Sequence, residues 1–87
     1  MFEVSIARGA KKSSKKLREQ YRRRVVEFLL ILRENPVPAE YYDIKKMKGF
    51  VDMFRARIGD IRIIYEVSWA TRKVNVLLIA PRETAYS

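Results

Sequence analysis

The sequence predicts an α+β domain in which helices pack on one face of a small, mostly antiparallel sheet. Three observations lead to this prediction. A short alternating strand comes first, a helical region in two segments follows it, and a three-stranded antiparallel meander closes the chain. At 87 residues the chain can build one modest core, so we expect a single domain over residues 1–87.

The N-terminal half changes from the period of a strand to that of a helix. Residues 2–6 alternate apolar and polar side chains, which predicts a half-buried strand ended by residues 8–9. A short, weakly amphipathic helix is expected over residues 10–17. A clearer helix is expected over residues 18–34, because apolar residues recur at helical spacing. These residues are Leu17, Tyr21, Val25, Phe28, Leu29 and Leu32.

The apolar arc of the longer helix is wider than one face. Val26, Leu30 and Ile31 fall outside the main stripe, so they either extend the core, which we favour, or form a docking surface for another chain. Prolines then end the helix, and residues 35–51 are expected to be irregular.

The C-terminal half predicts three strands. Residues 54–58 and 61–67 alternate on either side of Gly59-Asp60, which suits a two-residue type II′ hairpin loop. A second turn leads into residues 74–79, which are nearly all apolar and predict a strand buried on both sides.

The predicted register of these strands brings several of their basic residues together, and these residues form a candidate site. If Gly59-Asp60 is the loop, Arg57 faces Arg62 across the ladder, and Arg55 shares their face. Like charges placed directly opposite each other are destabilising, so we interpret the cluster as a phosphate-binding surface. The alternative is that exposed arginines spread into water and have no role.

Other basic and aromatic residues are weaker candidates for contacts with nucleic acid. Lys46 and Lys48 could line the same groove, and Tyr86 could stack on a base. A lysine-rich run could bind backbone phosphate or could simply form a solvated helix face. It consists of Lys11, Lys12, Lys15 and Lys16.

The amino-acid composition limits which catalytic groups and which binding partners can be expected. The chain has neither cysteine nor histidine, so we expect no metal site, no cofactor and no Cys–His or Ser–His nucleophile. Nineteen Lys and Arg against ten Asp and Glu give a net charge of +9, which favours nucleic acid as a partner over a membrane or an acidic protein. With no span-length apolar run, we expect a cytoplasmic protein that does not enter a membrane.

Several segments together resemble the RelE toxins of the RelE/ParE superfamily, in particular its short archaeal members. Residues 46–49 (KMKG) are similar to the family's K-L-x-G segment, and residues 54–65 (FRARIGDIRIIY) to its block of basic strand, turn and second strand. Residues 81–86 (PRETAY) resemble its C-terminal arginine and tyrosine. With the order of the elements, the resemblance covers nearly the whole chain.

The resemblance implies a microbial-RNase-like fold and a ribosome-dependent mRNA endonuclease. Such toxins enter the ribosomal A site and cleave the codon there by attack of a ribose 2′-OH on the neighbouring phosphate. It also implies inhibition by a cognate acidic antitoxin similar to RelB, whose helix Val26, Leu30 and Ile31 could receive, and it is compatible with a toxin–antitoxin heterotetramer. Its catalytic positions fall on Arg55, Arg57, Arg62, Arg82 and Tyr86.

The chemistry of arginine fits part of this implied reaction. A guanidinium group can clasp two phosphate oxygens, but its high pKa makes it a poor proton carrier. Family members carry lysines where this chain has Arg55 and Arg57. We therefore assign Arg62 and Arg82 to the scissile phosphate and the other two to orienting the strand, with Tyr86 as a base-stacking residue or an acid.

Three other hypotheses about the function also fit the sequence. A ParE-like toxin shares the fold but inhibits DNA gyrase. A basic module that binds RNA without cleaving it would need no proton carrier. A thermostable protein with a charged surface would have no nucleic-acid role at all.

Overall fold

The computed structural model describes residues 1–48 and 52–81. Within these residues the chain forms two helices and one five-stranded sheet. In chain order the elements are β1 (Glu3–Ile6), α1 (Arg8–Lys15), α2 (Glu19–Glu34), β2 (Asp43–Lys46), β3 (Met53–Ile58), β4 (Ile61–Ser68) and β5 (Lys73–Pro81).

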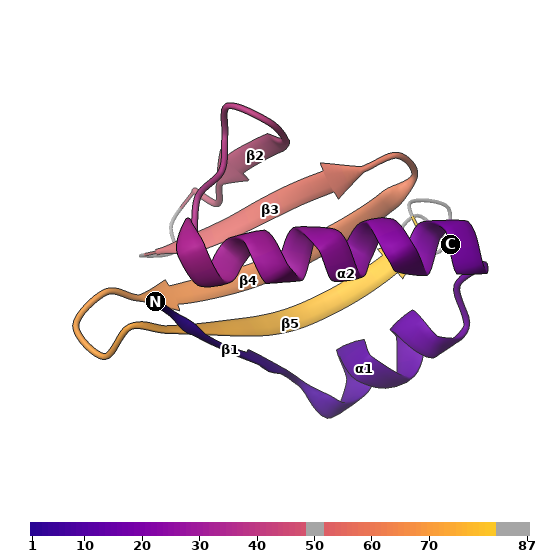
Figure 1. Cartoon of the computed structure of the whole chain (residues 1–87), viewed down its shortest axis with the longest axis horizontal. Coiled ribbons are helices and arrows are strands. Elements are labelled where there is room, and N and C mark those ends of the chain that lie inside the picture. The colour runs from indigo at the N-terminus through magenta and orange to yellow at the C-terminus, as the bar shows by residue number, and fades with distance from the viewer. Residues whose placement is uncertain (49–51, 82–87) are drawn as a thin grey trace.

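The sheet is mostly antiparallel, as the sequence predicts. Its strand order is β1-β5-β4-β3-β2, and β1 is the strand that pairs in parallel. Figure 1 shows α2 lying along one face of this sheet, with α1 beside β1 and β5 and with β2 at the opposite edge. The predicted α+β class, with helices on one face of a small sheet, is therefore confirmed.

One core holds α2 against the sheet. Val25, Phe28 and Leu32 of α2 are at most 2% exposed, and they belong to the same apolar cluster as the inward-facing residues of β3, β4 and β5. The ring of Phe28 makes edge contacts with Tyr42 and Tyr65, at centroid separations of 4.8 and 5.9 Å. Aromatic pairs of this kind stabilise a core beyond the area that they bury.

The hairpin between β3 and β4 has the predicted register. Ile58 pairs with Ile61, and Gly59 takes a positive φ of +59°, as the first loop position of a type II′ turn requires. Further along, the ladder between β4 and β5 shifts register between Ile64 and Tyr65, which leaves Leu77 as the extra residue. The bulge lies where the sequence reads as a continuous apolar strand.

Two predictions about the first half of the chain are wrong in detail. Residues 43–46 form β2, although the whole segment 35–51 is expected to be irregular. With one apolar residue among four, β2 has the composition of an edge strand, where lysines and short length discourage further pairing. Arg8 and Gly9 begin α1 rather than ending a strand.

The prediction that the last strand is buried on both sides is wrong for one of the two sides. Leu77 and Leu78 of β5 are 39% and 36% exposed, because both helices lie on the other side of the sheet. The strand is thus buried on the face toward α2 alone. Within the described residues, neither helix is long and apolar enough to cross a membrane.

Candidate functional site

The face of the sheet turned away from α2, called here the open face, carries the arginines of β3 and β4. Alternation places Arg55, Arg57 and Arg62 on this face, while Ala56 and Ile63 between them are fully buried beneath α2. The period of two in the sequence therefore sends the apolar residues into the core and the arginines to the other side.

Strand pairing brings these arginines together as the sequence predicts. Arg57 pairs directly with Arg62, and Arg55 pairs with Ile64 two residues further along. We call Arg55, Arg57 and Arg62 the arginine cluster. All three side chains are partly buried, so they lie in a setting where charge is less screened than on a fully exposed surface.

The next strand adds lysines to the same face. An open hollow of about 290 Å³ lies where β2 meets β3 and β4. Arg55 and Arg62 line it, whereas Arg57 lies outside it, toward the hairpin turn. Among the described residues, its lining consists of Lys45, Lys46, Met47, Lys48, Arg55, Arg62 and Ile64.

Two arginines of the cluster are not neutralised by ion pairs within the described residues. Neither Arg55 nor Arg57 forms an ion pair in the described part of the chain, even though Asp43 stands opposite Arg57 in the ladder. The Nε atom of Arg55 is buried and has no hydrogen-bond partner among the described residues. A buried donor without a partner is costly, and in native proteins it commonly binds water or a ligand oxygen. The hollow is thus suited to an anion.

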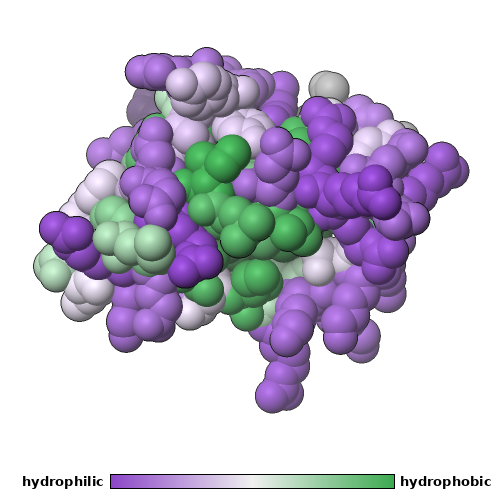
Figure 2. Space-filling model, viewed as in Figure 1, coloured by the Kyte–Doolittle hydropathy of each residue, from purple (hydrophilic) through white to green (hydrophobic). Residues whose placement is uncertain are grey.

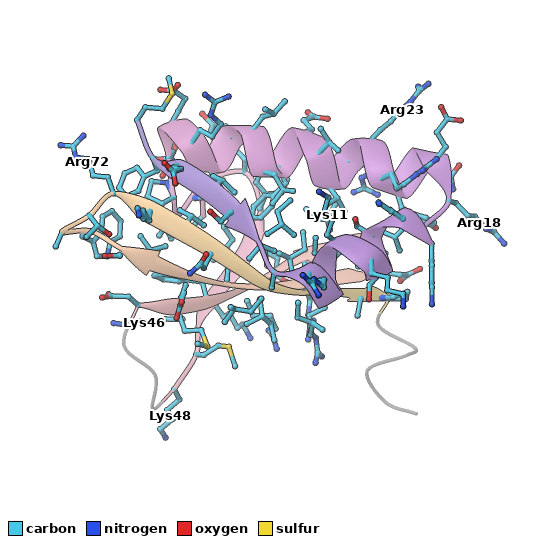
Figure 3. All side chains as sticks on the ribbon, turned by 90° about the horizontal axis from the view of Figure 1, so that it is seen from below. Lys11, Arg18, Arg23, Lys46, Lys48 and Arg72 are labelled. Carbon is cyan, nitrogen blue, oxygen red and sulfur yellow. The ribbon has the colours of Figure 1, made fainter. Side chains whose placement is uncertain are left out.

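The remaining predicted site residues are divided between the hollow and other parts of the chain. Lys46 and Lys48 line the hollow, as predicted for the groove, whereas the lysine-rich run lies on α1 (Lys11, Lys12 and Lys15) and directly after it (Lys16). Figure 3 shows Lys11 apart from Lys46 and Lys48. Arg82 and Tyr86 lie outside the described residues. In residues 1–48 and 52–81, no carboxylates group closely enough to suggest a metal site.

Comparison with known proteins places this geometry in a family. The family model described as the ParE toxin of the type II toxin–antitoxin system parDE matches residues 4–86. RelE1 of Methanocaldococcus jannaschii is 36% identical over 85 residues, which make up 98% of this chain and 94% of the relative. The chain belongs to the RelE/ParE family of toxins.

Solved structures agree on the fold of this toxin. A chain of the archaeal RelE–RelB complex from Pyrococcus horikoshii OT3 is 37% identical and matches with a TM-score of 0.85, over 93% of this chain and 94% of that one. A chain of the intact Escherichia coli RelBE complex matches with a TM-score of 0.78 at 19% identity, over 93% and 96% of the two chains. The sheet with its two helices is therefore the RelE fold.

One residue of the toxin's hollow was missed as a site residue by sequence reasoning. Lys45 pairs with Arg55 across the β2–β3 ladder and so shares the open face with the arginine cluster. Residues 35–51 are expected from the sequence to be irregular, so no register for Lys45 could be derived. The signal that could have found it is the short alternation of Ile44 with the polar residues on either side.

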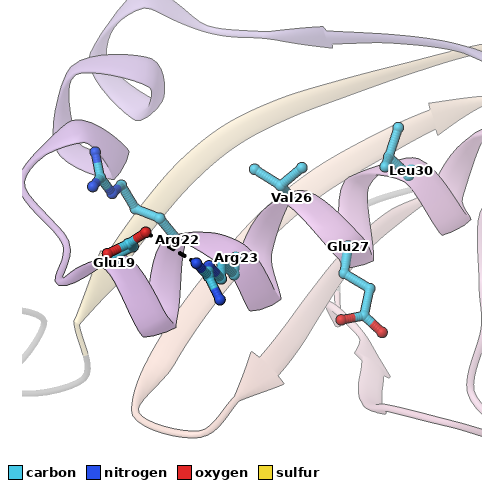
Figure 4. A pocket seen from close by; sticks show the side chains of 6 residues that line it. All are labelled: Glu19, Arg22, Arg23, Val26, Glu27 and Leu30. Carbon is cyan, nitrogen blue, oxygen red and sulfur yellow. Dashed lines mark hydrogen bonds and ion pairs between the residues drawn. The ribbon is translucent and has the colours of Figure 1, made fainter.

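A second surface of the toxin lies on the outer side of α2. Val26 and Leu30 are 54% and 55% exposed, so the prediction that they extend the core is wrong, whereas Ile31 is half-buried. Figure 2 shows an apolar patch over α2 with hydrophilic residues around it. Figure 4 shows that Val26 and Leu30 line a shallow hollow on this side together with charged residues of α2.

Proposed function

We propose that this toxin is a ribosome-dependent endoribonuclease that cleaves mRNA in the ribosomal A site. The observation that carries the proposal is the open face: Arg55 and Arg62 lie beside three lysines around one hollow, and the buried Nε–H of Arg55 has no acceptor among the described residues. Five cations converging on one hollow suit a phosphodiester far better than a neutral ligand. The names of the RelE relatives support the same assignment.

The reaction is an in-line displacement at phosphorus. The ribose 2′-oxygen bonds to phosphorus, the bond to the 5′-oxygen breaks, and the products are a 2′,3′-cyclic phosphate and a 5′-hydroxyl. The proton of the 2′-hydroxyl passes to water, while the departing 5′-oxygen must take up a proton. Guanidinium groups held in place before the reaction stabilise the extra negative charge of the phosphorane, an effect of the kind that contributes several kcal/mol in enzymes.

Each cation has a role in this proposal. Arg62, with Arg82, binds the scissile phosphate, Arg55 and Arg57 orient the strand, and Tyr86 stacks on a base. Lys46 and Lys48 bind the neighbouring phosphates.

Lys45 supplies the proton to the 5′-oxygen. An ammonium group carries a proton at neutral pH and can give it to a strongly basic alkoxide, whereas arginine holds its proton too tightly. Lys45 lines the same hollow as Arg62, so the phosphate that Arg62 binds lies within reach of both side chains. The lysine then recovers a proton from water.

The deciding experiment is primer extension on mRNA bound to programmed ribosomes. The wild-type toxin is expected to cut within the A-site codon, and Arg62→Gln to cut at least about 100-fold more slowly, because it loses a charged contact to the transition state. Arg72→Gln is the matched control, since Arg72 is an exposed arginine in the β4–β5 turn, away from the hollow. Uncut mRNA with the wild-type toxin, or equal rates for the two variants, would contradict the proposal.

A cognate antitoxin is the second part of the proposed function. We infer that an acidic, RelB-like chain covers this toxin and places an amphipathic helix on Val26, Leu30 and Ile31. Exposed apolar side chains with a charged rim are typical of a groove that receives a helix. A toxin–antitoxin heterotetramer is compatible with this arrangement.

Gyrase inhibition is the competing function, because the family model that matches is described as a ParE toxin. The arginine cluster favours RNA cleavage. Parallel assays of translation and of DNA supercoiling with the same preparation distinguish the two, since each function inhibits one process and spares the other.

A further inference from the structure

A second strongly basic surface lies outside the hollow, on α1 and the residues that flank it. From Val4 to Arg18 the sequence contains no carboxylate, while six cations fall between Arg8 and Arg18. All six side chains are exposed, and none of them forms an ion pair in the described part of the chain. We call this surface the α1 basic face; it consists of Arg8, Lys11, Lys12, Lys15, Lys16 and Arg18.

Helical geometry gathers the four lysines on one side of α1. At about 100° per residue, Lys11, Lys12, Lys15 and Lys16 span an arc of roughly 140°. Ala10, on the opposite side of α1, and Leu17, just after the helix, are buried in the core. The helix is therefore held to the domain through its small apolar side, and its lysines project away from the protein.

The composition of this face indicates what kind of partner it fits. Among the described residues, no large exposed hydrophobic side chain lies between Arg8 and Arg18. Protein interfaces are anchored by aromatic and apolar residues and are depleted in lysine. Phosphate backbones, by contrast, are bound by lysines acting as point charges, with release of counterions. The surface on α2 has the features of a protein interface, and the α1 basic face has those of a nucleic-acid backbone contact.

The α1 basic face is separate from the hollow. α1 packs beside β5, whereas the hollow lies on the open face of β2, β3 and β4. In Figure 3, Arg18 lies at the opposite end of the molecule from Lys46 and Lys48. Asp60 shares a small hollow with Lys16 and Arg18 but forms an ion pair with neither. One phosphate group cannot contact both surfaces.

We propose that the α1 basic face binds the phosphate backbone of folded RNA and docks the toxin on the ribosome, while the hollow on the open face binds the strand that is cut. This inference rests on the proposed function and adds a second RNA contact to it. The two surfaces have different roles: α1 contributes to affinity for the ribosome, and the hollow contributes to the cleavage step.

The test replaces Lys11, Lys12, Lys15 and Lys16 with glutamine, which removes four charges and keeps a good helix former. The KM for programmed ribosomes is expected to rise about 10- to 100-fold near 0.1 M salt, with the cleavage rate at saturation unchanged. Binding to a labelled RNA hairpin of about 16 base pairs should weaken in parallel, and its log–log salt slope should fall by about 3.

A control variant removes four exposed cations elsewhere, namely Arg23, Arg33, Arg72 and Lys73, each also changed to glutamine. If this control weakens hairpin binding as much as the α1 variant does, net charge alone is responsible and the inference is wrong. Thermal unfolding of both variants shows whether each has folded. An unfolded α1 variant is replaced by the pair Lys12→Gln and Lys15→Gln, for which half the change in salt slope is expected.

Three other outcomes also test the proposed role of the α1 basic face. A lower saturated rate with unchanged KM would place α1 in the cleavage step and overturn the inference. Weaker binding of an acidic antitoxin with unchanged binding of the hairpin would assign the face to a protein partner. If the wild-type toxin cuts no mRNA, the proposed function fails, and the hairpin measurement still tests the α1 basic face by itself.

Discussion

Tyr65 is the residue that links the sheet to the segment after α2. It is fully buried, and its hydroxyl donates a 2.8 Å hydrogen bond to the carbonyl oxygen of Pro36. Burial raises the pKa of this phenol above its ordinary value of 10.0. The same side chain stacks on Phe54 at 5.6 Å, so it packs between α2 and β3.

Replacement Tyr65→Phe should lower the free energy of unfolding by about 1–3 kcal/mol, because the Pro36 carbonyl is left buried without a donor. Urea unfolding at pH 7 measures this difference. An unchanged midpoint and slope would mean that water replaces the lost donor.

The raised pKa of Tyr65 also predicts a pH dependence at alkaline pH. Because the pKa in the folded state is higher than in the unfolded state, the contribution to stability is complete below pH 10 and declines as the pH rises above it. The difference in unfolding free energy between wild type and Tyr65→Phe should therefore shrink above pH 10. A constant difference from pH 7 to 11 would contradict this assignment.

Lys45 allows a chemical test of the proton donor. Lys45→Arg keeps the charge and removes the readily transferred proton, so cleavage of ordinary mRNA should slow about 100-fold or more. A substrate with sulfur in place of the 5′-oxygen should be cut at the wild-type rate, because a thiolate leaves without protonation.

Lys46→Arg is the matched control for this test, since Lys46 lines the same hollow but pairs with Phe54 rather than Arg55. The control should cut both substrates normally. Equal slowing of Lys45→Arg on both substrates would mean that Lys45 binds phosphate and transfers no proton.

At the scale of elements, the β3–β4 hairpin fixes the arginine cluster through the conformation of one glycine. Gly59→Ala should destabilise the toxin by about 1–2 kcal/mol, because φ of +59° is unfavourable for an alanine. The added methyl also approaches the Arg24 guanidinium at 2.9 Å, but that flexible side chain can move aside.

Gly9→Ala is the control for the hairpin variant. It lies in α1 with open space around it, so stability should stay equal or increase by up to about 1 kcal/mol. Thermal unfolding of both variants checks the pair. A hairpin variant as stable as the wild type would mean that the turn adopts another conformation at no cost.

The two sides of α2 predict different effects of the same kind of change. Leu30→Asp on the exposed side should leave stability nearly unchanged and weaken antitoxin binding at least about 10-fold, as expected for an apolar anchor. Leu32→Asp should unfold the protein, because Leu32 is fully buried. Calorimetric titration with the antitoxin measures the first effect, and unchanged affinity would exclude this side of α2 as its site.

For the whole molecule, a net charge of +9 within a radius of gyration of 12.1 Å means that the cations repel one another. Sodium chloride should therefore raise the melting temperature between 0.05 and 0.5 M, roughly the range over which the screening length falls from above to below 10 Å. Thermal scans measure the effect. A melting temperature that falls with salt would mean that attractive ion pairs outweigh the repulsion.

Sequence reasoning was most successful where the pattern of residues is local. The alternation around Gly59-Asp60 predicted the pairing of Arg57 with Arg62, because a two-residue loop leaves one register. It was least successful for β2, a short polar edge strand whose formation depends on pairing with β3. Lys45 was missed for the same reason.

The residue pattern was sufficient to predict β1, the two helices and the meander β3–β5 in their order, the inward faces of α2, β3 and β4, and the family to which the toxin belongs. Each of these follows from periodicity or from short motifs. The tertiary structure decided which sides stay uncovered: both helices pack on one face, so the open face of β5, the outer side of α2 and the lysines of α1 all remain exposed. Whether a side chain is exposed depends on which other elements pack against its own element. The residue pattern within one element does not reveal those neighbours.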